Sequence, residues 1–314
     1  LSRSMSARNS LRSTTMDNDY ATFDTTRHDC GDAVGDVDIR PISSHTAPVS
    51  DPATERSLRV WTAGDYDRIS TGFRDEAEAF VARVALTGSE DVLDSACGTG
   101  NLTIPAARTG ARVTGFDLVP ALLDVTANWA TRECLPIQLD QGTVEELPYD
   151  DASFDVVLSM FGLMFAARPD RVATELARVT RPGGRVALAN WTRNGFIGQL
   201  LATHVAYVPP PAGSVSPLLW GDESVVRERL NERDWNVTTT LRTLTFRYPY
   251  SPAGTADLFR TCYGPTIRTM EALDARRARL LASELALHWE SHQRPGALGT
   301  EVQSQYLEVV AVRL

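Results

Sequence analysis

Residues 92–101 read VLDSACGTGN, an apolar run that leads into a glycine-rich turn. The pattern predicts a strand at Asp91–Asp94 and then a tight turn into a helix, because Gly98 and Gly100 lack the Cβ atom that would restrict the backbone. The free N–H groups and the positive end of that helix suit a carboxylate. Asp94, at the end of the strand, is placed to pair with an ammonium group. The stretch therefore predicts a site for a ligand with an amino-acid tail.

A second strand is predicted at Arg112–Asp117, and it ends in the sequence GFD at residues 115–117. A carboxylate at the tip of this strand can accept hydrogen bonds from both hydroxyls of a ribose, a device that nicotinamide enzymes share. A dinucleotide-binding fingerprint would need a third glycine at position 103, where this chain has Thr103. The sequence of the first turn thus disfavours a nicotinamide cofactor. A nicotinamide dehydrogenase is left open as an alternative, and a binding measurement with both cofactors would decide it.

Strands and helices alternate beyond residue 51, which predicts an α/β fold with a doubly wound, Rossmann-like sheet. Further strands are predicted at Ile137–Gln141, Phe154–Ser159, Arg185–Trp191, Val237–Tyr248 and Tyr306–Val312. Helices are predicted at Asp75–Leu86, Leu102–Ala107, Ala121–Ala130, Arg171–Val179, Phe196–Tyr207, Glu223–Asn231, Thr255–Leu273 and Ala275–His288. We expect a disordered or loosely docked extension over 1–51, a cofactor-binding core with N-terminal lid helices over 52–191, and a helical lid with the last two strands over 192–314.

The motifs resemble those of the class I S-adenosylmethionine-dependent methyltransferases, in particular the group similar to ubiquinone and menaquinone biosynthesis methyltransferases. The resemblance covers residues 61–191 and rests on four motifs: DSACGTG at 94–100, GFD at 115–117, LPYDDASFD at 147–155 and RPGG at 181–184. It implies S-adenosylmethionine as the cofactor. It also implies a seven-stranded sheet in the order three-two-one-four-five-seven-six, with strand seven antiparallel and helical lid insertions.

The resemblance further implies which residues hold the cofactor. Asp117 would hold the ribose, Gly98 and Gly100 would lie against the methionine part, and Ser159 would face the sulfonium. Where the family usually has Asp-Ala before a glutamate, this chain has Thr143 and Val144, so the adenine contact is expected to shift to the backbone of Val144. The expected cofactor-binding residues are Tyr66, Asp94, Ala96, Gly98, Gly100, Asp117, Leu118, Thr143, Val144, Glu145 and Ser159.

Charge and composition exclude several other classes. The formal net charge is −9 and the chain contains no lysine, so we expect no nucleic-acid partner. Charged or turn residues interrupt every apolar run, so we expect no membrane partner. Residues 1–48 lack the apolar region of a secretory signal, and the four separated cysteines are interpreted as free thiols, which together favour the cytoplasm. No metal site is expected, because His288 and His292, four residues apart, lack a third ligand. A homodimer is left open.

The residues after Trp191 are expected to cover the open end of the sheet, because ligands of such sheets bind beyond the carboxyl ends of the strands. The segments Gly195–Trp220 and Ser251–His292 should then border the acceptor pocket. Within them we expect His204 as a general base and Tyr263 as a second catalytic residue, with Trp220 nearby.

The sequence therefore predicts an enzyme that transfers a methyl group from S-adenosylmethionine to O, N or C of a small, moderately apolar metabolite of specialised (secondary) metabolism. The alternative is an S-adenosylmethionine-binding protein with a cyclase-type or regulatory role. Release of S-adenosylhomocysteine with a candidate acceptor separates the two. The residues identify the methyl donor better than the acceptor, because in-line transfer from a sulfonium needs no conspicuous base.

Overall fold

The structure is a computed structural model that describes residues 43–44, 51–231 and 233–314. Most of the expected extension over 1–51 therefore lies outside the described residues, as does Cys30. Two parts of it are described. Ser43–Ser44 forms a short strand, β1, and Asp51 caps the first helix by accepting from the backbone N–H of Thr54 at 3.1 Å. Helix α1 begins at Pro52, directly after this capping residue, and the division of the chain at residue 51 stays a prediction.

The described strands form one sheet in the order β1-β4-β3-β2-β5-β6-β8-β7. Neighbouring strands are parallel except β8, which is antiparallel to both β6 and β7. The seven longer strands confirm the predicted doubly wound order, and β1 adds a two-residue strand beside β4 that the sequence did not predict. The strands are β2 (Asp91–Ser95), β3 (Arg112–Asp117), β4 (Ile137–Gln141), β5 (Phe154–Met160), β6 (Thr180–Trp191), β7 (Trp235–Tyr248) and β8 (Thr300–Arg313).

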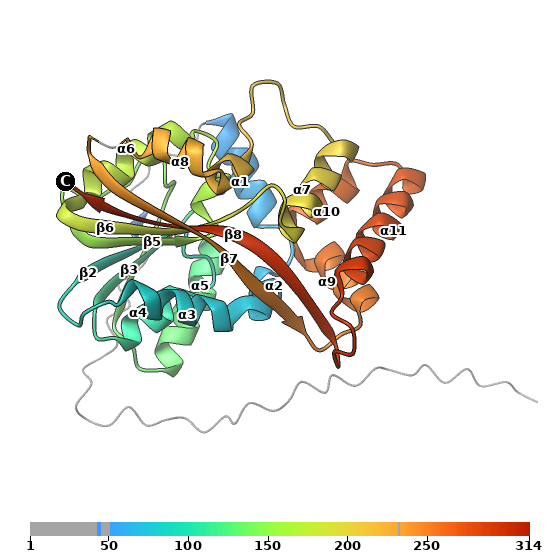
Figure 1. Cartoon of the computed structure of the whole chain (residues 1–314), viewed down its shortest axis with the longest axis horizontal. Coiled ribbons are helices and arrows are strands. Elements are labelled where there is room, and N and C mark those ends of the chain that lie inside the picture. Colours follow the sequence, from blue (N-terminus) through green and yellow to red (C-terminus); the bar gives the residue numbers. More distant parts are fainter. Residues whose placement is uncertain (1–42, 45–50, 232) are drawn as a thin grey trace, which may run out of the picture.

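Helices cover both faces of this sheet, with α6 and α8 above it and α3, α4 and α5 below it in Figure 1. The helices of the core and its entrance are α1 (Pro52–Trp61), α2 (Tyr66–Ser70), α3 (Arg74–Val84), α4 (Thr103–Arg108), α5 (Pro120–Arg132), α6 (Pro169–Val179) and α8 (Glu223–Arg229). Those of the lid are α7 (Phe196–Tyr207), α9 (Pro252–Cys262), α10 (Gly264–Glu271) and α11 (Ala275–His292). The described residues also form three 3₁₀ turns: η1 (Thr71–Phe73), η2 (Leu163–Phe165) and η3 (Pro217–Gly221).

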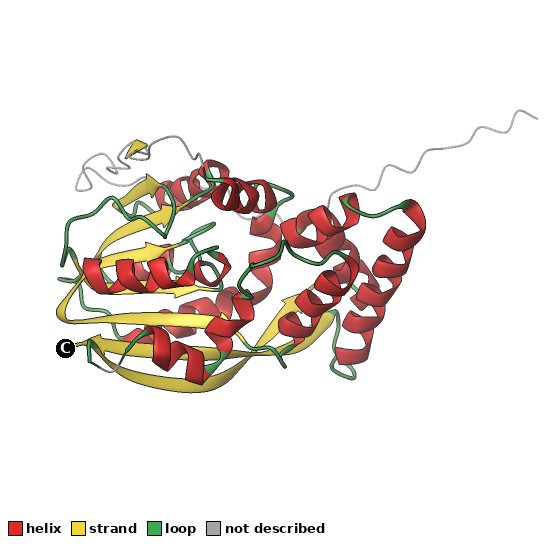
Figure 2. Cartoon of the chain, turned by 90° about the horizontal axis from the view of Figure 1, so that it is seen from above, coloured by secondary structure: helices red, strands yellow, loops and turns green. Residues whose placement is uncertain are grey.

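The antiparallel pair of β7 and β8, between which the chain forms α9, α10 and α11, joins the lid to the sheet. Residues 306–312 of β8 pair with both β6 and β7, whereas residues 300–305 pair with β7 but not with β6 and extend beyond the sheet. This extension reaches the lid helices, which cluster beside the sheet in Figures 1 and 2. Trp289 and Phe259 fill the apolar interior there, and the hydroxyl of Tyr248 donates to the carbonyl of Ile69 at 2.6 Å. The lid is therefore packed as one extension of the sheet and is fixed to α2.

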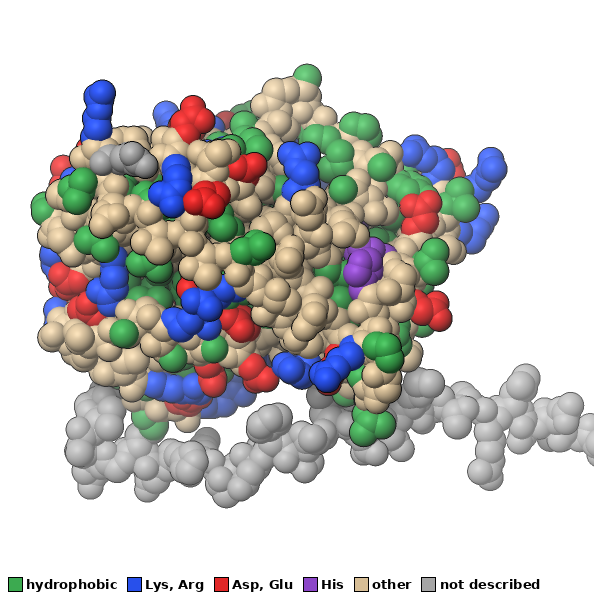
Figure 3. Space-filling model, in the orientation of Figure 1, with side chains coloured by type: hydrophobic (Ala, Val, Ile, Leu, Met, Phe, Trp, Pro, Cys, Tyr) green, Lys and Arg blue, Asp and Glu red, His purple; other side chains and the backbone are tan. Residues whose placement is uncertain are grey.

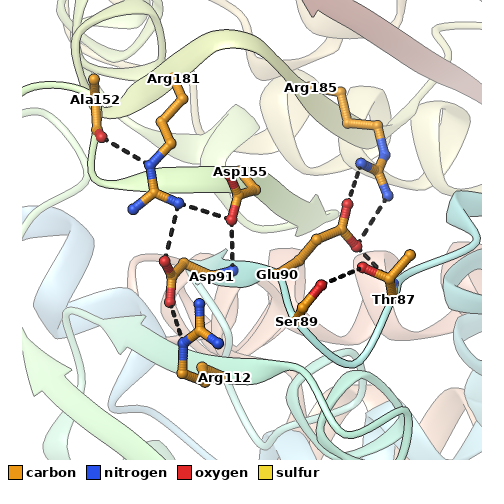
Figure 4. A network of polar contacts seen from close by, with 9 residues as sticks. All are labelled: Thr87, Ser89, Glu90, Asp91, Arg112, Ala152, Asp155, Arg181 and Arg185. Carbon is orange, nitrogen blue, oxygen red and sulfur yellow. Dashed lines mark hydrogen bonds and ion pairs between the residues drawn. The ribbon is translucent and has the colours of Figure 1, made fainter.

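An ion-pair network ties four strand starts together at the amino end of the parallel strands (Figure 4). Arg181 bridges two carboxylates, at 2.9 Å to Asp91 and 2.7 Å to Asp155. Asp91 also pairs with Arg112 at 2.6 Å. The backbone N–H of Asp91 donates to Asp155 at 2.9 Å. The RPGG motif, which begins at Arg181, thus has a structural function at this edge.

We expect Arg181→Ala to lower the free energy of unfolding by about 1–2 kcal/mol, since it removes two half-exposed ion pairs and leaves two carboxylates facing each other. Urea unfolding measures this loss. Arg112→Ala is the matched control, because Arg112 makes one ion pair and is 63% exposed, and it should cost less than about 0.5 kcal/mol. Neither change should affect ligand binding at the carboxyl ends of the strands. Equal losses for the two variants would contradict a bridging role for Arg181.

Candidate functional site

A cavity lies at the carboxyl ends of β2, β3 and β5, beneath α1 and α2. Of the residues expected to hold the cofactor, all except Gly100 and Ser159 line this cavity. The wall also contains residues outside that set: Thr54, Ser57, Trp61, Phe73, Cys97, Thr99, Asn101, Leu102, Val119, Leu122, Met160, Phe161, Gly162, Phe165 and Ala166. The spacing of Thr54, Ser57 and Trp61 on one helical stripe is a signal that could have identified the α1 wall.

The two glycines of the turn after β2 have different functions. Gly98 has φ +55°, and a Cβ atom there would meet no atom within 4 Å, because it would point into the cavity. Gly100 has φ +89°, and a Cβ atom there would lie 2.9 Å from the side chain of Thr126 on α5. Gly98 therefore provides space for a ligand, whereas Gly100 provides space for a packed helix. This corrects the expectation that both glycines lie against the cofactor.

Asp94 is a buried carboxylate, 1% exposed, that lines the cavity. The hydroxyl of Thr103 donates to it at 2.6 Å. Burial raises the pKa of Asp94 to about 7, and the nearby charge of Asp117 adds to this shift. Asn101, also on the wall, has a buried side-chain oxygen without a hydrogen-bond partner among the described residues. A carboxylate and an unpaired carbonyl oxygen facing one cavity fit an ammonium group, which supplies the donors that both need.

Asp117 lies at the end of β3 and is held there by the neighbouring turns. One carboxylate oxygen accepts from the N–H of Gly98 at 2.8 Å, and the other accepts from the N–H of Val119 at 2.9 Å. Burial raises its pKa, and these backbone donors partly oppose that effect. Each oxygen keeps a free lone pair, so the carboxylate can still accept from ribose hydroxyls.

The segment Thr143–Glu145 forms the far wall of the cavity. The hydroxyl of Thr143 accepts a hydrogen bond from the backbone N–H of Glu145 at 3.3 Å. This bond stabilises the turn that contains both residues. Glu145 is 5% exposed and accepts from the backbone N–H of Arg168 at 2.8 Å as well as from its side chain. Glu145 is thus neutralised within the protein and shapes the wall. The backbone of Val144 remains on the lining, where the sequence predicts the adenine contact.

Ser159 does not line the cavity. Its hydroxyl donates to the carbonyl of Ser95 at 2.6 Å and accepts from the N–H of Leu163 at 3.3 Å, which ties β5 to β2. The next two residues, Met160 and Phe161, line the cavity instead. The expectation that Ser159 faces the sulfonium is therefore corrected: side chains alternate along a strand, and this one points away from the site.

The expected catalytic residues of the lid lie away from the cavity. His204 is 5% exposed, and its Nε2 lies 3.0 Å from the hydroxyl of Thr266. Burial, followed by the charge of His288, lowers the pKa of His204 to about 4. Tyr263 packs edge-on against Trp61 with ring centroids 6.1 Å apart, and Trp220 is 1% exposed under Arg229. None of the three residues lines either described cavity, so we assign them to the packing of the lid and not to catalysis.

A second hollow, an open groove of about 520 Å³, adjoins the first cavity. Four residues line both: Ser57, Trp61, Phe165 and Ala166. The ring of Trp61 lies 4.9 Å from that of Phe165 and 5.7 Å from that of Tyr66, centroid to centroid. The rest of the groove comes from α1, η2 and the residues just after it, α7 and the loop that follows it, the start of η3, and α10. Parts of both expected acceptor segments, Gly195–Trp220 and Ser251–His292, thus border this groove and not the first cavity.

The structure also bears on three other expectations from the sequence, which concern the cysteines, a metal site and a membrane-spanning helix. Cys97 and Cys262 are free and buried, but Cys134 is disulfide-bonded, so the interpretation of all four cysteines as free thiols is wrong for Cys134. Among the described residues, no group of three or more His, Cys, Asp or Glu side chains is arranged to hold a metal ion. His288 instead contacts the carbonyl of Phe196 at 3.0 Å. Within the same residues, no helix combines the length and hydropathy needed to span a bilayer.

Comparisons with known proteins agree with this geometry. Residues 93–188 match the methyltransferase domain family. The chain is 36% identical to an uncharacterized protein of Mycobacterium tuberculosis over 235 residues. This matched stretch covers 74% of this chain and 84% of that protein. It is 32% identical to a demethylmenaquinone methyltransferase of Tropheryma whipplei over 179 residues. That stretch covers 55% of this chain and 72% of the methyltransferase. The solved YcgJ protein of Bacillus subtilis shares the fold, with a TM-score of 0.50, 15% identity, and coverage of 76% of this chain and 98% of that one.

Proposed function

The chain belongs to the class I S-adenosylmethionine-dependent methyltransferases, and from this premise we propose that it methylates O, N or C of a small, moderately apolar metabolite. The side chains at the junction of the two spaces support this acceptor class. The groove that adjoins the cofactor cavity is walled by aliphatic and aromatic side chains at the junction, where Trp61 and Phe165 line both spaces. An acceptor in the groove would reach the cofactor at this junction.

The proposed cofactor contacts follow from the wall. Asp94 and Asn101 bind the ammonium group, Asp117 binds the ribose hydroxyls, and the segment Thr143–Glu145 borders the adenine. Tyr66 closes the cavity from α2, where its half-buried ring packs on Trp61. Burial, together with the charge of Asp117, raises the pKa of Tyr66, so its hydroxyl stays protonated and can donate. The bound cofactor supplies an electrophilic methyl group on a sulfonium.

The protein's own contribution at the junction is positioning and the exclusion of water. The four residues that line both spaces include no acidic, basic or thiol side chain, and Ser57 has the one hydroxyl among them. Methyl transfer to a nucleophile that is held near attack distance in a dry pocket gains much of its acceleration from that arrangement. The proposal therefore assigns no general base, and the nucleophile has to be reactive by its own chemistry.

The alternative from the sequence, a cofactor-binding protein with a cyclase-type or regulatory role, has less support. The matched family and the relative with a stated activity are both methyltransferases. Formation of S-adenosylhomocysteine during incubation with an apolar acceptor supports transfer. Conversion of an acceptor without formation of S-adenosylhomocysteine would favour the cyclase.

We expect Asp117→Ala to weaken S-adenosylmethionine binding by about 1.5–3 kcal/mol, the range for a hydrogen bond to a charged group. Isothermal titration calorimetry measures this loss, and NAD serves as the ligand control for the dehydrogenase alternative. Because Asp117 also holds the N–H groups of Gly98 and Val119, thermal unfolding of both proteins must accompany the titration. Undiminished affinity in a folded variant would refute the ribose contact, and tight NAD binding would refute the cofactor specificity.

A further inference from the structure

Helix α1 presents two adjacent stripes of side chains to the two spaces. Thr54, Ser57 and Trp61 line the cofactor cavity, at the spacing of one helical face. Ala53, Arg56 and Val60 lie one position earlier in each turn and line the groove. A ligand in the groove would therefore lie beside the cofactor along the whole helix, with Arg56 one residue away from the shared Ser57.

The groove differs in charge from the rest of the chain. Its described lining contains three arginines, Arg56, Arg168 and Arg268, and no Asp or Glu. The chain as a whole has 40 acidic residues against 31 basic ones. Figure 3 shows both kinds mixed over one face of the molecule. An arginine on such a wall favours an anionic ligand where no carboxylate of the protein already pairs with it.

The three arginines are not equally available. Arg168 pairs with Glu145 and with Asp51, the latter at 3.1 Å, and Arg268 pairs with Glu271 at 2.6 Å and donates to the carbonyl of Arg59. Arg56 is exposed and makes no hydrogen bond or ion pair with any described residue. Arg56 is therefore the groove arginine that is left to bind a charged group of a ligand.

Most of the remaining wall of the groove is apolar, although Ser57, Ser214 and Thr269 also line it. From the core side it has Met164, Phe165 and Ala166, and from the lid side Leu201, Val208, Val215 and Pro265. The loop after α7 contributes Pro211–Val215 and rises from the top of the molecule in Figure 1. A space of about 520 Å³ lies within the range of small-molecule sites. The groove thus combines a large apolar surface with one available cation.

We propose that the methyl acceptor is an amphipathic anion, with an apolar body in the groove and an ionised oxygen group, carboxylate or phosphate, bound by Arg56. This inference rests on the proposed function, because it names the acceptor class of that same site. Arg56 is here a specificity-determining residue that holds the acceptor, while the reacting atom lies at the junction beside Trp61. The charged group also orients the apolar body, which by itself could slide along the groove.

The test measures binding of three probes of similar shape, 2-naphthoate, 2-naphthyl phosphate and uncharged 2-naphthamide, by equilibrium dialysis. Each is measured with and without S-adenosylhomocysteine. We expect at least one anion to bind roughly five- to tenfold more tightly than the amide, as a charge-assisted contact at a partly exposed site would give. Comparison of the two anions identifies the acidic group. An amide that binds as tightly as both anions would overturn the proposal.

Matched variants of α1 assign the effect to one residue. Arg56→Gln should reduce the preference for the anion to about twofold or less. Arg59→Gln removes the same charge from the same helix, but Arg59 lines neither space. The Arg59→Gln variant should therefore prefer the anion over the amide as strongly as the unchanged protein does. Equal effects of the two variants would show a general charge effect and overturn the role of Arg56. Failure of S-adenosylhomocysteine to bind would count against the proposed function alone, because the preference is also measured without it.

Discussion

Replacing Gly98 with valine should abolish S-adenosylmethionine binding and leave the protein folded. A side chain at this position would extend into the cavity, since nothing in the protein lies within 4 Å of its Cβ position. Titration calorimetry should show a loss of at least about a hundredfold in affinity for Gly98→Val, which corresponds to about 2.7 kcal/mol or more. Gly98→Ala, with a single added methyl group, should lose less, on the order of tenfold.

The backbone itself resists any side chain at Gly98, because its φ of +55° is strained for other residues. Gly183 is the matched control: its φ is +78°, its Cβ position is equally open, and it lies in the RPGG motif at the other end of the sheet. Gly98→Val and Gly183→Val should therefore lose similar stability, but Gly183→Val should keep the affinity for the cofactor. If both variants lose binding in proportion to their stability, the cavity function assigned to Gly98 is wrong.

The part of the site that the sequence predicted best is the strand, turn and helix at residues 91–108. Its chemistry is local: a carboxylate at the strand end, a glycine with open space, and a helix start all follow from consecutive residues. Asp117 could be predicted for the same reason, because parallel strands end at one edge. Gly100 shows the limit. A positive φ can be inferred from a glycine, but the neighbour that a Cβ would meet, Thr126, comes from another helix.

Side-chain direction explains the error at Ser159. The sequence placed Ser159 correctly near the end of β5. The face of the sheet on which a side chain lies, however, depends on the register of its strand with the neighbouring strands. In the structure the Ser159 hydroxyl bonds to β2, and the lining begins at Met160. No pattern within β5 distinguishes these two outcomes, since Val157, Leu158 and Ser159 are all buried.

The lid was predicted in outline only. Helix Phe196–Tyr207 agrees in both bounds with α7, yet the helix is apolar on several sides, so its pattern did not show whether His204 faces the site or the lid interior. The last strand was predicted from Tyr306, whereas β8 begins at Thr300. Its first six residues are mostly polar, although buried and more exposed positions alternate there. Their partner is the distal half of β7, a long-range pairing that local hydropathy does not reveal.

Asp94 leads to the second large effect, a dependence of cofactor affinity on pH. The pKa of its carboxyl is about 7 in the ligand-free protein, chiefly because the group is buried. An ammonium group pairs with the ionised form, so binding lowers this pKa and releases a proton whenever the free site is protonated. Affinity should therefore be constant between about pH 7.5 and 8.5 and should fall by about tenfold for each pH unit below 7. Calorimetric titrations in buffers of different ionisation enthalpy measure both the affinity and the proton release.

Asp94→Asn should lower the affinity at pH 8 by a hundredfold or more, on the order of 3–5 kcal/mol for a broken buried pair, and should remove the pH dependence. The variant keeps an oxygen that accepts from Thr103. It should also melt at a higher temperature than the unchanged ligand-free protein at pH 8. A carboxyl whose pKa is raised from 3.8 to about 7 by folding binds more protons when folded, so its ionisation costs stability as pH rises through that range. An affinity that stays constant from pH 5.5 to 8 in the unchanged protein would contradict the pairing of Asp94 with the cofactor's ammonium group. A lower melting temperature for the variant would contradict the buried, charge-opposing environment from which the prediction starts.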